Sequence, residues 1–138
     1  MDELKFELKT NPDPEEQKII RNGIIEFNES IIKDKHECFN IIVKNNENII
    51  AGAIIYQHKD ALYIDVIWCL EEYRKNGIGS KLMNMIEEEA RTKSIKTLFV
   101  DTYAFQAQEF YKKHNFKVIS VVPEYLAGYD RIFMRKDI

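Results

Sequence analysis

The sequence has little cysteine, proline and glycine: its 138 residues include two Cys, three Pro and five Gly. Cys38 and Cys69 show neither a CxxC spacing nor a nearby histidine pair, which argues against a disulfide or zinc framework and predicts reduced thiols that fill the core. A chain of this length buries roughly two thirds of its unfolded surface without such staples. Because no linker, repeat or low-complexity segment interrupts it, we predict a single domain over residues 1–138.

Positive charge and long apolar runs are also scarce. The chain has 20 Lys plus Arg against 23 Asp plus Glu, a formal net charge of −3, and therefore lacks the basic excess that a nucleic-acid partner requires. No stretch approaches the ~18 apolar residues of a membrane span, and no apolar run follows a basic N-terminus. We expect a cytoplasmic protein with neither a nucleic-acid nor a membrane partner.

Apolar periodicity predicts a mixed α/β fold with a largely antiparallel central sheet flanked by helices. Alternating or continuous apolar runs predict strands at 4–9, 39–43, 49–56, 62–70, 97–102, 116–122 and 131–134. Helical spacing predicts helices at 15–32, from about 78 to 90, and at 107–114. Gly23 and Asn28 predict that the first helix breaks into two.

A loop rich in glycine and positive charge separates the strand at 62–70 from the following helix. Its sequence is Arg74-Lys75-Asn76-Gly77-Ile78-Gly79-Ser80. Glycines before a helix N-terminus let unpaired backbone N–H groups approach an anion, so the segment is suited to bind phosphate. Its spacing fits neither a P-loop nor a dinucleotide fingerprint, since Leu82 stands where the latter needs a third Gly or Ala.

The loop pattern R-x-x-G-x-G resembles that of the GCN5-related N-acetyltransferases, and the resemblance covers essentially the whole chain. The approach to the loop at 66–74 and the aromatic segment at 106–116 are similar to two further family segments. Two positions depart from the family pattern. Asn115 replaces a usual Gly, and Ala104 replaces an Asn that contacts the coenzyme in many members, a role that Gln106 could take over.

The resemblance implies the acyl-CoA N-acyltransferase fold, in which the family's fourth and fifth strands, here 62–70 and 97–102, splay apart to hold acetyl-CoA. It implies that the backbone of Ile67, Trp68 and Cys69 contacts the pantetheine arm and the thioester. Residues Arg74, Lys75, Asn76, Gly77, Ile78, Gly79 and Ser80 would hold the pyrophosphate. Tyr111 matches the helix tyrosine that protonates the departing thiolate, and packing in the core is its alternative role. No metal is implied.

Two carboxylates are candidates for handling the amine. Asp65 lies inside an apolar strand and alternates with Tyr63, Ile67 and Cys69, which predicts that they share one face. Asp101 ends the next strand and would lie across the cleft. Either carboxylate could accept the amine proton through water or bind a cationic substrate, or it could be a hydrogen-bonded structural group.

Other residues receive structural interpretations. We expect Trp68 to pack on the sheet, and His36 and His58 to be surface turn residues. The segment 123–130 reads equally as an acceptor-binding lid or as an ordinary hairpin loop.

The combined prediction is transfer of acetyl from acetyl-CoA to a primary amine, by direct attack, with a small cationic acceptor. A protein or peptide amine, a non-catalytic acetyl-CoA sensor and a thiol enzyme that uses Cys69 are the alternatives. A homodimer is left open.

Overall fold

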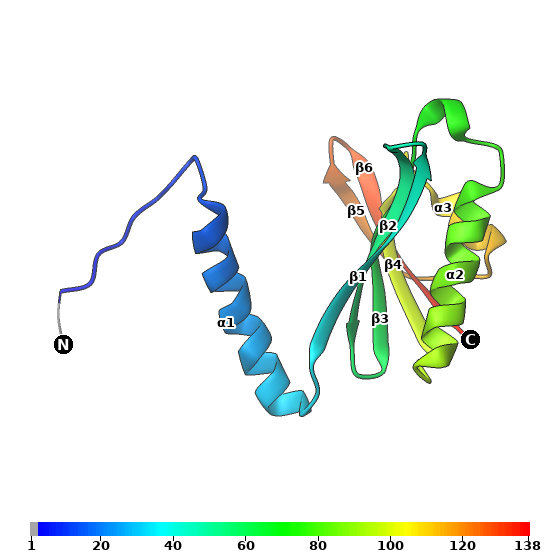
Figure 1. The fold of residues 1–138 in the computed structure, drawn as a ribbon. Helices are drawn as coiled ribbons and strands as arrows, with labels where there is room; N and C mark the ends of the chain where they lie inside the picture. The colour runs from blue at the N-terminus through cyan, green and yellow to red at the C-terminus, as the bar shows by residue number, and fades with distance from the viewer. Residues whose placement is uncertain (1–2) are drawn as a thin grey trace. The chain divides into compact units, whose positions relative to one another are not determined.

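The computed structural model describes residues 3–138, and the chain divides into two compact units, residues up to 34 and residues 35–138 (Figure 1). The single domain over residues 1–138 stays a prediction. No helix among the described residues is long and apolar enough to cross a membrane.

The N-terminal unit is built on one helix, α1 (Pro14–Ile32). The Asp13 side chain accepts from the Glu15 N–H at 2.9 Å and caps the helix start, and Lys33 ends the helix with a φ of 62°. The predicted break at Gly23 and Asn28 is wrong, because a single Gly costs only about 1 kcal/mol in a helix and leaves its hydrogen bonds in place. The predicted strand at 4–9 is also wrong. Among the described residues no other strand pairs with this segment, and an alternating pattern needs a partner to form a ladder.

The second unit contains a six-stranded sheet in the order β1-β2-β3-β4-β6-β5. All neighbours are antiparallel except β3 and β4, which confirms the mixed, largely antiparallel sheet. The strands are β1 (His36–Asn45), β2 (Asn48–His58), β3 (Ala61–Cys69), β4 (Thr97–Tyr103), β5 (Lys117–Leu126) and β6 (Tyr129–Asp137).

The parallel pair β3 and β4 separates halfway along its length. Pairing covers Ala61–Ile64 and Thr97–Val100 and then stops, although β3 continues to Cys69 and β4 to Tyr103. The splayed strands of the predicted fold are therefore present. Beyond this point β3 keeps its ladder with β2 on one edge only, so its other edge offers unpaired backbone groups.

A β-bulge at Asp65 corrects the predicted face of β3. Ile54 pairs with Val66 while Ile55 pairs with Ile64, so Asp65 is the extra residue. Ile64 and Ile67 both pack toward the same core, and Tyr63 therefore lies on the opposite face from Ile67. The alternation expected from the sequence fails because one inserted residue reverses the facing of everything after it.

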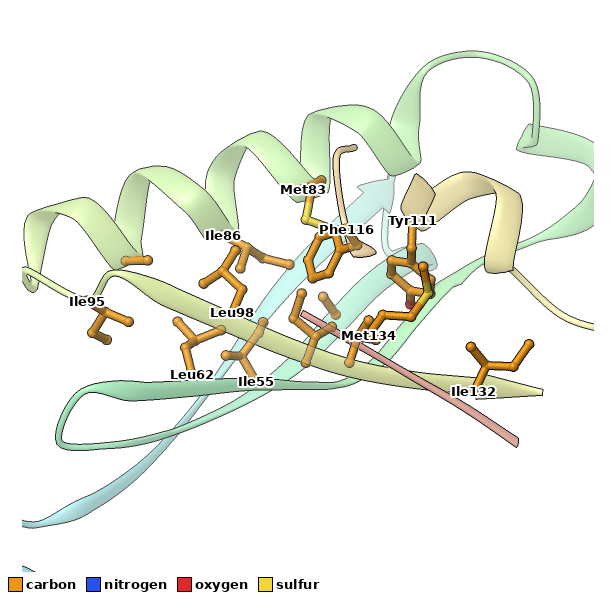
Figure 2. Packing of buried hydrophobic residues seen from close by; sticks show 14 residues of the cluster. Ile55, Leu62, Met83, Ile86, Ile95, Leu98, Tyr111, Phe116, Ile132 and Met134 are labelled. Atoms are coloured by element: carbon orange, nitrogen blue, oxygen red, sulfur yellow. The ribbon is translucent and has the colours of Figure 1, made fainter. Parts of the chain in front are cut away.

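The core lies between the sheet and two helices, α2 (Ile78–Thr92) and α3 (Gln108–Lys113). The buried stripe of α2 includes Met83 and Ile86, which pack over Ile55, Leu62 and Leu98 of the sheet (Figure 2). The periodicity at 78–90 therefore predicted the helix and its buried face correctly. Fully burying each such aliphatic side chain contributes about 1.5–3 kcal/mol.

Several smaller predictions are corrected by the second unit. Cys38 is exposed on β1 rather than buried, while Cys69 is partly buried. His36 and His58 are not turn residues but register partners in β1 and β2. The segment 123–130 is mostly strand, because β5 runs to Leu126 and only a two-residue turn precedes β6. Pro123 is tolerated there since β5 is an edge strand.

Candidate active site

A cavity of about 730 Å³ opens where β3 and β4 separate. It is lined by the end of β3, the loop before α2, the first turn of α2, the end of β4 and α3. The lining contains every predicted site residue except Asn76: Asp65, Ile67, Trp68, Cys69, Arg74, Lys75, Gly77, Ile78, Gly79, Ser80, Asp101, Gln106 and Tyr111. One splayed strand pair thus brings together residues up to 46 positions apart in the sequence (Asp65 to Tyr111).

The loop before α2 is held in shape by its own polar groups. The Arg74 Nε donates to the Cys69 carbonyl at 2.9 Å, and the Asn76 Nδ2 donates to the Tyr73 and Arg74 carbonyls at 3.1 Å each. Lys75 and Gly77 take positive φ values of 63° and 77°. Asn76 therefore shapes the loop and is not part of the cavity wall.

The first turn of α2 faces the cavity with unused backbone donors. Its first i to i−4 bond runs from the Lys81 N–H to the Gly77 carbonyl at 3.0 Å, so the N–H groups before Lys81 have no partner within the helix. A Cβ at Gly77 would meet no atom within 4 Å, and the backbone is open to an approaching anion there. With the Arg74 and Lys75 charges beside them, these donors suit a phosphate group.

Contacts with α3 fix the position of this first turn. A Cβ at Gly79 would lie 2.9 Å from the Phe110 ring, so only glycine allows this close approach. The Ser80 hydroxyl and the His114 Nε2 lie 3.1 Å apart. Burial, with the charge of Lys136, lowers the pKa of His114 below its usual value, which favours the neutral imidazole at neutral pH.

Tyr111 lines the cavity and is otherwise buried. The residue is 5% exposed, and its ring packs edge-on against Phe110 and Phe116 at centroid distances of 5.3 and 5.6 Å. No hydrogen bond joins its hydroxyl to another described residue, and the oxygen is not sealed from solvent. Burial, reinforced by the negative charge of Asp101, raises the pKa of Tyr111 to about 12. The phenol therefore keeps its proton at neutral pH.

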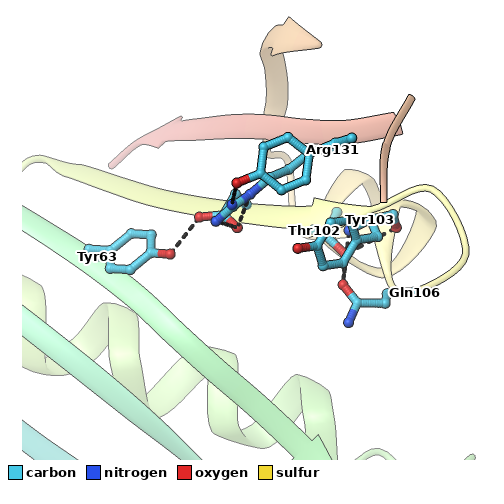
Figure 3. A network of polar contacts seen from close by, with 7 residues as sticks. Tyr63, Thr102, Tyr103, Gln106 and Arg131 are labelled. Carbon is cyan, nitrogen blue, oxygen red and sulfur yellow. Dashed lines mark hydrogen bonds and ion pairs between the residues drawn. The ribbon is translucent and has the colours of Figure 1, made fainter. Parts of the chain in front are cut away.

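Asp101 lies on the cavity wall in a network of polar contacts, of which Figure 3 labels Tyr63 and Arg131. Its Oδ1 accepts from the Arg131 Nη2 at 2.8 Å and Nε at 3.1 Å, and its Oδ2 accepts from the Tyr63 hydroxyl at 2.5 Å. The Asp101 side chain is 13% exposed. Burial and the bond to Asp101 raise the pKa of Tyr63 above its usual value. No local sequence pattern indicates this network, because Arg131 lies on another strand, 30 residues from Asp101.

Asp65 and Gln106 differ in the hydrogen bonds and ion pairs that their side chains make. Asp65 is exposed at the bulge and has no ion pair among the described residues. The Gln106 Oε1 accepts from the Tyr103 N–H at 2.9 Å and from the Thr102 hydroxyl at 3.2 Å, which orders the turn between β4 and α3 (Figure 3). The Nε2 group of Gln106 has no hydrogen-bond partner among the described residues, so it can donate to a ligand in the cavity.

The model of the acetyltransferase (GNAT) family matches residues 2–116 of the chain. The chain belongs to the GNAT acetyltransferase family. A curated acetyltransferase from Agrobacterium fabrum is 27% identical over 136 residues, which are 96% of this chain and 98% of the relative. The crystal structure of a Bacillus cereus acetyltransferase shares 33% identity, with a TM-score of 0.77 over 96% of this chain and 98% of the other. A structure from Agrobacterium tumefaciens reaches a TM-score of 0.85 at 25% identity, over 98% and 100% of the two chains.

More distant GNAT structures share the fold. The ribosomal-protein-S18-alanine N-acetyltransferase of Escherichia coli has a TM-score of 0.67 at 21% identity, over 73% of this chain and 69% of the other. An aminoglycoside 6'-N-acetyltransferase complexed with coenzyme A has a TM-score of 0.66 at 17% identity, over 73% of each chain. One GNAT fold thus serves both protein and small-molecule acceptors, and the acetyltransferase activity of this chain does not define its acceptor.

Proposed function

We propose that this GNAT enzyme transfers acetyl from acetyl-CoA to the primary amine of a small molecule by direct attack of the amine on the thioester. The observation that carries the proposal is the cavity itself. At the first turn of α2 it offers backbone N–H groups that have no partner within the helix and can bind an anion. At Tyr111 it offers a phenol that keeps its proton and has no hydrogen-bond partner among the described residues.

The cavity offers each part of acetyl-CoA a matching group. Lys75 and the first-turn N–H groups of α2 suit the pyrophosphate, and Arg74 adds charge while it ties the loop to Cys69. The open edge of β3 at Ile67–Cys69 offers backbone hydrogen bonds to an extended amide chain. The Gln106 Nε2 is the group that we propose in place of the Asn absent at position 104. Acetyl-CoA supplies the activated acetyl group as a thioester.

The reaction needs a neutral amine, a polarised carbonyl and a stabilised leaving sulfur. We assign Asp65 to attract the ammonium form of the acceptor and to receive its proton through water, because its carboxylate is exposed and unpaired in the cavity wall. The N–C bond forms as the C–S bond breaks. Tyr111 donates a hydrogen bond to the departing sulfur. The products are an amide and the free thiol, because the proton that the amine loses ends on the departing sulfur.

Asp101 has a different role from Asp65 in this proposal. Both of its oxygens already accept hydrogen bonds from Arg131 and Tyr63, so neither oxygen is free to receive the proton of the amine. We therefore assign Asp101 to positioning: it fixes Tyr63 and Arg131 beside the cavity and keeps Tyr111 protonated through its charge.

The acceptor and the cellular setting complete the proposal. A single uncommitted carboxylate suits a small amine with one positive charge. Two free thiols suit a reducing compartment, and we propose that the enzyme works in the cytoplasm.

The test is a thiol-release assay over a panel of small amines and N-terminal peptides, with acetyl-CoA binding followed by thermal shift. Wild type should turn over a small amine, and Lys75→Gln should weaken acetyl-CoA binding. Lys59→Gln is the matched control, since Lys59 also has a positive φ but lies in the β2–β3 turn. If no amine is acetylated and acetyl-CoA leaves Tm unchanged, the proposal is wrong. Acetylation of peptides alone would overturn the small-molecule part.

A further inference from the structure

Four aromatic side chains form a continuous surface next to the cavity, which we call the aromatic platform: Tyr103, Phe105, Tyr125 and Tyr129. Phe105 stacks on Tyr103 with a centroid distance of 5.4 Å and an interplanar angle of 3°, and Tyr129 meets Phe105 edge-on at 4.9 Å. Tyr125 lies 6.0 Å from Tyr103. The rings come from the last residue of β4, from the β4–α3 turn and from the two strands beside the β5–β6 turn.

The platform is exposed although it is apolar. Phe105, Tyr125 and Tyr129 are 52%, 50% and 48% exposed. Aromatic residues gathered on a surface in this way mark binding sites, because each ring offers a large contact area at a small cost in conformational entropy. Phe105 also lines the cavity. The platform is therefore continuous with the proposed acetyl-transfer site.

The charges around the platform select what it binds. The Arg131 guanidinium already lies over Tyr125 at 4.9 Å and over Tyr103 at 5.7 Å, and its Nη1 donates to the Tyr125 hydroxyl at 2.9 Å. This guanidinium already takes the position of a cation on both rings, so the platform favours an uncharged group. Phe105 stacks on Tyr103 and is still 52% exposed, so its ring offers further aromatic contact area to a flat group.

From this arrangement we infer that the acceptor is an arylalkylamine, an amine joined by a short carbon chain to an aromatic ring. Its ring stacks on Phe105 and contacts Tyr129, while its amine points into the cavity toward Asp65. This inference rests on the proposed function, since it names the acceptor of the same site.

The experiment compares 2-phenylethylamine with 2-cyclohexylethylamine, which has a similar size but no aromatic ring. Ring stacking adds an attraction beyond buried area, and wild type should prefer 2-phenylethylamine by about 2- to 10-fold in kcat/KM. Phe105→Leu should reduce this ratio to about one. Phe99→Leu is the matched control, because it makes the same change on β4 outside the cavity lining, and should keep the wild-type ratio.

Equal kcat/KM for the two amines, or a ratio that Phe105→Leu leaves unchanged, would overturn the inference. So would a Phe105→Leu variant whose main loss is acetyl-CoA affinity, since Phe105 would then serve the coenzyme. If neither amine is turned over, calorimetric Kd values of both amines for the protein with coenzyme A present give the same ratio and decide the matter. Failure of the proposed function is recognised separately, by the absence of acetyl-CoA binding and of turnover with any amine.

Discussion

Replacing Tyr111 by Phe tests what the phenol does in the reaction. The pKa of Tyr111 is raised to about 12, whereas an ordinary thiol has a pKa of about 8.5. Complete proton transfer from this phenol to a thiolate would be uphill by about 3.5 pKa units, or about 5 kcal/mol. Tyr111 is therefore expected to stabilise the departing sulfur by a hydrogen bond and to keep its proton.

The expected loss follows from the strength of such a bond. A hydrogen bond to a charged group contributes about 1.5–3 kcal/mol, so Tyr111→Phe should lower kcat about 10- to 150-fold. Acetyl-CoA affinity should hold, since the phenol contacts the sulfur only as charge develops there. The fold should survive with a loss of about 1 kcal/mol or less, because the ring still packs on Phe110 and Phe116 and its hydroxyl has no partner among the described residues.

The assay measures kcat by thiol release between pH 7 and 10, together with Tm and the Kd of acetyl-CoA. Tyr56→Phe supplies the control, because it removes a phenol from β2, outside the cavity lining. A kcat within twofold of wild type for Tyr111→Phe would refute the role of the hydroxyl. A wild-type kcat that falls through a pKa below 10 and loses this fall in Tyr111→Phe would refute the raised pKa.

Three further outcomes concern stability. The pKa of Tyr111 in the folded protein is above the usual 10, so its contribution to the free energy of unfolding is complete below pH 10 and is lost as the pH rises toward 12. Urea titrations should show this free energy falling by about 3 kcal/mol over that range. In Tyr111→Phe the fall should be smaller. Gly79→Ala should destabilise the protein by about 1–2 kcal/mol through contact with the Phe110 ring, and it should cost less in a Phe110→Leu background. The same loss of Tm in both backgrounds would contradict the clash. Lys136→Met leaves the buried Glu87 without its nearest cation and should lower the free energy of unfolding by about 2–4 kcal/mol. Adding Glu87→Gln to this variant should restore most of that stability. If the effects of the two substitutions were simply additive, this coupling would be contradicted.

Local patterns predicted most of the second unit. The hairpin signals correctly predicted β1, β2 and β3, and the apolar spacing correctly predicted α2, because the apolar faces of these elements pack in the sheet and the core. The same reasoning failed for residues 4–9, since a strand depends on a partner edge that its own sequence does not supply. It failed again at 123–130, where pairing with β6 extends β5 beyond its apolar run.

The candidate site divides in the same way. The loop at Arg74–Ser80, which we propose binds phosphate, could be located in the sequence because its glycines and the helix start are adjacent there. The facing of Asp65 could not, because a bulge adds one residue without a sequence signal. The partners of Asp101 were missed for a related reason: Tyr63 and Arg131 reach it only through the alignment of three strands.

The sequence by itself determined the mixed α/β class, the family resemblance and the modest acidity that argues against a polyanionic partner. These features depend on residue type and on short spacings. Only the tertiary structure decided which of the two cavity carboxylates has no partner among the described residues, that Tyr111 lines the cavity, and where the aromatic platform lies. Each of these depends on side chains from different strands and turns, whose meeting is set by sheet order and by the early end of the β3–β4 pairing.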